Sequence, residues 1–235
     1  MKGEFQPRFI MFDLDGTLVD TAGEIAESVN RTLDEAGLSR LPDELIRQWI
    51  GRGTAWLFGN VLERLSGDPE VRTSPLYARW YPRFLEIYDE LTGLLSAPYP
   101  GAREALALLQ EQGCRLGVVT NKDRALTQRL LDHHALTCVF DVLVAGGDTP
   151  HGKPSPQPLQ LALEKAGVSA SEALFVGDSS NDVKASRQAG VPVWAFNHGY
   201  NHGEPIAASG PDQVLDSYAE LMERLGLPAQ SSLSR

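Results

Sequence analysis

Short apolar runs recur along this chain, and longer stretches in which apolar residues recur at a spacing of three and four separate them. The short runs are RFIMF (8–12), RLGVVT (115–120), DVLVAG (141–146), ALFVG (173–177) and PVWAF (192–196). Continuous runs of this length, several rich in Val, Ile or Phe, are typical of strands that are buried on both faces of a parallel sheet.

Helical patterns lie between these predicted strands, over residues 101–113, 124–136, 155–167 and 181–190. Several of them stop at glycine, as the C-termini of helices often do. Strand and helix alternate, so the sequence predicts an α/β fold with a parallel sheet and right-handed crossovers.

Residues 20–99 break this alternation, because they contain no convincing strand. Apolar residues recur there at helical spacing, which predicts helices. The expected helices cover residues 21–38, 42–51, 54–67 and 77–95. We therefore expect a helical insertion at 20–99, directly after the first strand, and a sheet domain made of residues 1–19 and 100–235.

Composition narrows the class of protein. The 235 residues carry a formal net charge of −10, which argues against a nucleic-acid or anionic-membrane surface, since either would need a basic patch. No apolar run approaches the roughly 18 residues of a membrane span, and no apolar signal core precedes the first strand. Cys114 and Cys138 form no metal or redox spacing. These features predict a cytoplasmic protein, a monomer or small homo-oligomer, with a small-molecule partner.

Polar side chains follow four of the predicted strands, where open α/β sheets bind their ligands. They are Asp13 and Asp15 after the first run, Thr120, Asn121 and Lys122 after the second, Lys153 after the third, and Asp178 and Asp182 after the fourth. These groups would converge on one rim of the sheet. Lys122 is expected to be solvated or at the edge of this rim. Asn121 is the better candidate for contact with a bound phosphate group.

The chemistry of such a rim points to phosphate and a hard cation. Clustered carboxylates disfavour their own ionisation unless a cation binds them, and oxygen ligands suit Mg²⁺ together with a substrate phosphate. A carboxylate such as Asp13 can act as a nucleophile, and Asp15, two residues further on, can give and take protons. Thr120, Asn121 and Lys153 offer hydrogen-bond donors and one positive charge for phosphoryl oxygens.

The segments DLDGT, VVTNK, the lysine of GKP and GDSSND resemble, in order and spacing, the four motifs of the haloacid dehalogenase-like hydrolase superfamily. The helical insertion stands where that superfamily places its cap. The resemblance implies a Rossmann-like parallel sheet core with an inserted α-helical cap. It also implies that Asp13 is the nucleophile and a Mg²⁺ ligand, that Asp15 is the general acid/base and binds the metal through its backbone carbonyl, and that Asp178 is a metal ligand.

The same resemblance implies that Thr120 and Lys153 hold the phosphoryl group, and that Asp182 supports the metal shell or orients Lys153. An aspartate at position 15 points to phosphatase or phosphomutase chemistry, because the dehalogenase branch has no aspartate there. Within the superfamily the chain looks most like the phosphoglycolate phosphatase family, over stretches such as WIGRGTAWL, GGDTPHGKPSPQPL and the GYNHGE segment. Arg52 departs from the asparagine that this family often carries, and it is a candidate substrate contact.

Other interpretations stay open at this point. Related enzymes act on sugar phosphates, including N-acetylmuramic acid 6-phosphate, and a phosphomutase or a non-catalytic phosphate-binding protein would share the fold. Thr120 and Asn121 alone would be read as strand-end caps, and Asp182 could cap the helix that follows it. His198 and His202 have a spacing seen in zinc sites, but without a third ligand a loop role is expected. Asp20 stands where the chain leaves for the insertion and is left out of the catalytic set.

Overall fold

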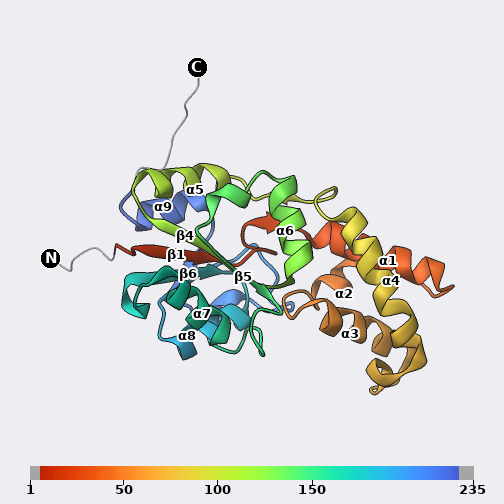
Figure 1. The fold of residues 1–235 in the computed structure, drawn as a ribbon. Coiled ribbons are helices and arrows are strands. Elements are labelled where there is room, and N and C mark those ends of the chain that lie inside the picture. The colour runs from red at the N-terminus through yellow and green to blue at the C-terminus, as the bar shows by residue number, and fades with distance from the viewer. Residues whose placement is uncertain (1–5, 228–235) are drawn as a thin grey trace.

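A six-stranded parallel sheet runs through the larger part of the molecule in the computed structural model, which describes residues 6–227 (Figure 1). The strand order is β5-β4-β1-β6-β7-β8. The strands are β1 Phe9–Phe12, β4 Arg115–Asp123, β5 Val142–Gly146, β6 Ala173–Gly177, β7 Val193–Phe196 and β8 Gln213–Leu215. The first five match the predicted runs. The edge strand β8 was not predicted from the sequence, because its three residues are too few to form a recognisable pattern.

Strand β1 is central because both of its faces carry large apolar side chains. All four of its residues are completely buried, and they alternate between two hydrophobic clusters on opposite faces of the sheet. Ile10 and Phe12 pack on one face, whereas Phe9 and Met11 pack on the other. The chain runs from β1 outward to β4 and β5 and then returns to β6 on the other side of β1. The carboxyl end of β1 is therefore a topological switch point, where such sheets bind ligands.

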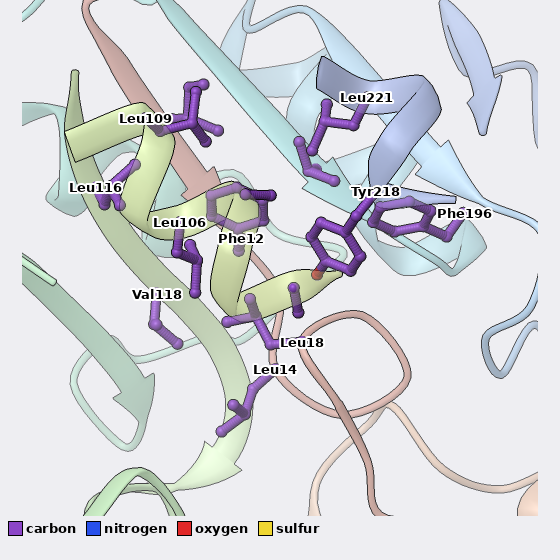
Figure 2. Packing of buried hydrophobic residues seen from close by; sticks show 14 of the residues in the cluster. Phe12, Leu14, Leu18, Leu106, Leu109, Leu116, Val118, Phe196, Tyr218 and Leu221 are labelled. Atoms are coloured by element: carbon purple, nitrogen blue, oxygen red, sulfur yellow. The ribbon is translucent and has the colours of Figure 1, made fainter. Parts of the chain in front are cut away.

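Helices cover both faces of the sheet. Figure 1 shows α5 and α9 above the sheet and α7 and α8 below it. Figure 2 shows Phe12 among Leu106 and Leu109 of α5 and Leu116 and Val118 of β4. These helices and α6 have the bounds α5 Ala102–Glu111, α6 Arg124–His133, α7 Gln157–Ala166, α8 Ser180–Ala189 and α9 Tyr218–Arg224. This arrangement confirms the predicted α/β fold with a buried parallel sheet.

Four α-helices and a short 3₁₀ turn form the insertion after β1, on the right of Figure 1. The α-helices are α1 Ala22–Glu35, α2 Asp43–Arg47, α3 Thr54–Ser66 and α4 Pro75–Leu91. They share a hydrophobic cluster that is separate from the two clusters of the sheet. A two-stranded antiparallel ribbon, β2 Val19–Asp20 with β3 Ala97–Pro98, joins the exit and the return of the chain. The fold class therefore includes the predicted helical cap, and the exact division at 19/20 and 99/100 stays a prediction.

No helix within residues 6–227 is long and apolar enough to cross a membrane.

Candidate active site

Asp13 follows β1 directly, and its backbone N–H donates to the carbonyl of Val176 in β6 (2.9 Å), which continues the sheet pairing. Its carboxylate Oδ1 accepts from the backbone N–H of Leu14 at 2.7 Å and lies 2.9 Å from the Lys153 ammonium. Gly16 then turns the chain at φ +85°, and a Cβ at this position would lie 2.5 Å from Oδ2 of Asp178. A side chain at position 16 would therefore be both strained and blocked by Asp178.

Lys153 is a buried ammonium held between two carboxylates. Its Nζ lies 2.9 Å from Oδ1 of Asp13 and 2.7 Å from Oδ1 of Asp182, and it donates to the carbonyl of Val119 at 2.9 Å. Burial acts to lower the pKa of Lys153, but the charges of the two carboxylates more than offset it and leave this pKa raised. The lysine therefore stays charged beside Asp13.

Both carboxylate oxygens of Asp182 accept hydrogen bonds from other residues of the chain. Oδ1 accepts from Lys153, and Oδ2 accepts from the backbone N–H groups of Asp178 and Ser179 and from the Ser179 hydroxyl, at 2.7–3.1 Å. This arrangement is a capping box at the start of α8. Burial acts to raise the pKa of Asp182, yet Lys153 and these donors hold it below its usual value. The geometry suits the predicted orienting role toward Lys153 and also the simple capping role.

Asp178 receives donors from two distant segments. The Thr17 hydroxyl donates to its Oδ1 at 2.6 Å, and the backbone N–H of Tyr200 donates to its Oδ2, also at 2.6 Å. Burial raises the pKa of Asp178 well above its usual value, and it raises that of Asp13 to about 7 against the lowering effect of Lys153. Lys153 alone therefore does not offset the burial of these two carboxyl groups.

The donor set suits a hard divalent cation. One carboxylate oxygen from each of Asp13, Asp178 and Asp182 falls within 4.8 Å of the others. When all three carboxylates are ionised, the ammonium of Lys153 leaves two negative charges in this buried site. A cation of charge +2 with oxygen ligands would balance them, and Mg²⁺ is such a cation.

Thr120 and Asn121 lie on the same rim, at the irregularity of β4 between the pairings Val119–Val144 and Asp123–Gly146. Thr120 is buried and lines the cavity beside Asp13 and Asp15. The Asn121 amide is fully engaged, because its Oδ1 accepts from the Lys153 backbone N–H (2.8 Å) and its Nδ2 donates to the carbonyls of Gly51 (2.9 Å) and Lys153 (2.8 Å). In this conformation Asn121 holds the Lys153 loop and the insertion together.

A cavity of about 30 Å³ lies between the rim and the insertion. Asp13, Asp15 and Thr120 line it from the sheet side. The apolar side chains of Ile25, Ile50, Leu57 and Phe84 line it from the insertion. The carboxylates therefore face a small space that the insertion lines mostly with apolar side chains.

Arg52 lies outside this cavity, although its neighbours Gly51 and Gly53 line it. Its guanidinium sits 5.1 Å from the ring centroid of Trp56, in a separate hollow that His202 also lines. The substrate contact of Arg52 stays a prediction. His202 contacts the carbonyl of Gln48 through Nδ1 at 2.8 Å.

Of the two places expected for Lys122, solvated or at the edge of the rim, the solvated one is wrong, and Lys122 lines the cavity at the rim. Lys122 is only 4% exposed, and its ammonium lies 3.1 Å from Oδ1 of Asp15. The Thr21 hydroxyl donates to the same oxygen at 2.8 Å. Sequence reasoning did not identify Lys122 and Thr21 as partners of Asp15, because no pattern around them shows that the insertion folds back over the end of β4.

Comparisons with known proteins agree with this geometry. The sequence profile of the haloacid dehalogenase-like hydrolases matches residues 10–196. The chain is 37% identical to a phosphoglycolate phosphatase of Nitrosococcus oceani, over 95% of this chain and 99% of that protein. It is also 37% identical to a phosphoglycolate phosphatase of Vibrio parahaemolyticus, over 94% and 97% of the two chains. The crystal structure of a predicted phosphoglycolate phosphatase from Haemophilus somnus 129PT superposes with a TM-score of 0.88 at 34% identity, covering 94% of this chain and 99% of that one.

Proposed function

Because this chain belongs to the haloacid dehalogenase-like hydrolases, we propose that it is a phosphoric monoester hydrolase that converts 2-phosphoglycolate to glycolate and phosphate. One observation carries the proposal. Asp13 stands at the switch point of the sheet with a charged lysine 2.9 Å from its carboxylate, and Asp15 lines the same cavity. This pairing offers a nucleophile and a proton carrier on the two sides of one phosphate ester.

The proposed reaction has two steps, and side chains of the protein carry out both of them. Asp13 attacks phosphorus in line, the bond from phosphorus to the ester oxygen breaks, and Asp15 gives its proton to the departing alkoxide. Asp15 then takes a proton from a water molecule that attacks the aspartyl phosphate, which releases phosphate and restores both carboxyl groups. Lys153 and Thr120 bind phosphoryl oxygens, and Asp182 keeps Lys153 in place.

The proposed cofactor is Mg²⁺, held by the carboxylates of Asp13 and Asp178 and by the backbone carbonyl of Asp15. When bound, it neutralises charge on the phosphoryl oxygens and in the carboxylate cluster. The excess of negative charge around Asp13, Asp178 and Asp182 supports this assignment.

Helices α1–α4 are the proposed cap over this site, within residues 20–99. The cavity between the cap and the sheet is narrow, and movement of the cap away from the sheet would let substrate enter. Its return excludes bulk water from the aspartyl phosphate.

A panel of phosphate esters tests the proposal by phosphate release in the presence of Mg²⁺. The panel includes 2-phosphoglycolate, N-acetylmuramic acid 6-phosphate and hexose phosphates. We expect 2-phosphoglycolate to give the highest kcat/KM and a chelator to abolish its hydrolysis. Phosphate that returns to a sugar rather than appearing free would indicate a phosphomutase instead.

The variant Asp13→Asn tests the nucleophile, and Asp68→Asn on the surface of the insertion is its matched control. We expect loss of turnover in Asp13→Asn and no change in the control. Near-full turnover by Asp13→Asn would contradict the proposal. So would an unmodified protein that releases phosphate from none of the esters.

A further inference from the structure

Lys122 makes a buried polar contact that the proposed reaction has not yet used. Its side chain is 1% exposed, and its Nζ donates to Oδ1 of Asp15 at 3.1 Å and to the hydroxyl of Tyr88. The ammonium also lies 4.4 Å from the centroid of the Tyr88 ring. A lysine is rarely buried unless it is paired. Here its partners are the proposed acid/base residue and a tyrosine of α4.

The hydrogen bonds to Asp15 are one-sided. Among the described residues, the side-chain donors to this carboxyl group are Lys122 and Thr21, and both bind Oδ1. A carboxylic acid that accepts two hydrogen bonds on one oxygen carries its own proton on the other oxygen. Oδ2 of Asp15 is therefore the atom from which a proton can leave.

The Lys122 contact also connects the sheet domain to the insertion. Three consecutive residues at the end of β4 bind the insertion: Asn121 donates to the Gly51 carbonyl, Lys122 donates to Tyr88, and Asp123 accepts from a hydroxyl in α3 at 2.6 Å. Tyr88 is 2% exposed. The Lys122 ammonium thus has its full set of contacts only when α4 packs over the site.

The Lys122 ammonium lies among acidic groups of the chain. Besides Asp15, the buried Glu24 of α1 faces it. Burial raises the pKa of Glu24, and the positive charge of Lys122 opposes that rise. Within residues 6–227, Oε1 of Glu24 has no hydrogen-bond partner. The Lys122 ammonium is thus already held by Asp15 and Tyr88 beside Glu24, so a role toward Asp15 is favoured over one toward an anionic group of a substrate.

We propose that Lys122 is a positioning residue. Together with Thr21, it holds Oδ1 of Asp15 so that the proton on Oδ2 faces the leaving oxygen. This arrangement is complete once α4 has packed over the site and Tyr88 contacts Lys122. The inference rests on the proposed phosphatase reaction. In the step it serves, the O–H bond at Oδ2 breaks and its proton passes to the leaving oxygen. The bond from phosphorus to that oxygen breaks with its electron pair remaining on the oxygen.

Leaving-group dependence tests this role, because an ester with a very acidic leaving group needs no proton donor. The variant is Lys122→Met, and exposed Lys184→Met on α8 is its control. The substrates are 2-phosphoglycolate, ethyl phosphate and 2,4-dinitrophenyl phosphate, and kcat/KM reports all steps through departure of the leaving group. We expect Lys122→Met to lose about 100-fold in kcat/KM on both alkyl esters and to stay within about threefold of the unmodified protein on the dinitrophenyl ester. The control variant should match the unmodified protein on all three.

Two patterns would overturn the inference. An equal loss on the dinitrophenyl ester would indicate general damage to the site. A loss confined to 2-phosphoglycolate, with ethyl phosphate hydrolysis retained, would assign Lys122 to the substrate carboxylate.

Tyr88→Phe gives a second test that keeps the lysine and is independent of whether Lys122→Met folds. It should show a smaller loss, again on the alkyl esters only, and an equal loss on all three esters would again overturn the inference. An unmodified protein without activity on any ester would contradict the proposed function itself, which is a different outcome from all of these.

Discussion

The hydroxyl of Tyr200 joins the loop after β7 to the first residues of α1, and its removal should destabilise the fold measurably. Tyr200 is 3% exposed, and its hydroxyl oxygen accepts from the backbone N–H groups of Thr21 at 2.9 Å and Ala22 at 3.1 Å. The hydroxyl also donates to the carboxylate of Asp20. The variant Tyr200→Phe removes these three interactions and leaves the backbone in place.

The expected cost follows from what each partner can do afterwards. Thr21 is fully buried, so its N–H loses its acceptor at a cost of about 1–3 kcal/mol. The Ala22 N–H keeps a long contact of 3.4 Å to Asp20, and Asp20 itself is exposed and can bind water. We therefore expect the free energy of unfolding to fall by about 2 kcal/mol, with a drop of about 4 °C in Tm for a chain of this length.

Thermal and urea unfolding followed by circular dichroism, without added metal, measures this change. The matched control is Tyr77→Phe, because the hydrogen bond of the Tyr77 hydroxyl among the described residues is a long, exposed contact of 3.3 Å to a carbonyl in α3. The control should stay within about 0.5 kcal/mol of the unmodified protein. A Tyr200→Phe variant with an unchanged midpoint, or a control that loses as much, would refute the reasoning.

Two further predictions follow from packing and burial. In Gly199→Ala, the new Cβ would lie 2.2 Å from Cβ and Oδ2 of Asp178, so this carboxylate must shift, and we expect kcat/KM with Mg²⁺ to fall by about 100-fold. The control Gly23→Ala, whose Cβ would meet only a carbonyl at 3.5 Å, should keep its activity, and equal activity of both variants would contradict the placement of Asp178. In thiol labelling followed by peptide mass spectrometry, exposed Cys138 should react well before Cys114, because burial raises the pKa of the Cys114 thiol to about 11. Faster labelling of Cys114 would contradict this prediction, because it would mean that the Cys114 thiol is more exposed than in the structure.

Much of the architecture could be predicted from the chain itself, because the elements of the sheet domain carry strong local signals. Each predicted strand is a run buried on both faces, as Phe9–Phe12 shows with four completely buried residues. The ribbon of β2 and β3 could not be predicted, since it has two residues on each side and pairs Val19 with Pro98 across the whole insertion. Pairing between such distant short segments leaves no periodic pattern in the sequence.

The candidate site, like the fold, could be predicted from the sequence only in part. The motifs indicated Asp13, Lys153 and Asp182, and the structure brings the lysine within 2.9 Å of both carboxylates. Lys122 and Thr21 were missed as partners of Asp15, because their importance depends on contacts made across the interface between sheet domain and insertion.

The sequence by itself determined the alternation of strands and helices, the place of the helical insertion, and the types and order of the polar residues at the strand ends. These properties are local, since they follow from periodicity, turn residues and motif spacing along the chain. Only the tertiary structure decided which oxygen of Asp15 receives donors, that Lys122 is buried, and how Tyr200 ties the loop after β7 to α1. Such contacts join residues between 6 and 179 positions apart, and they exist only because packing of the insertion against the sheet excludes water from them.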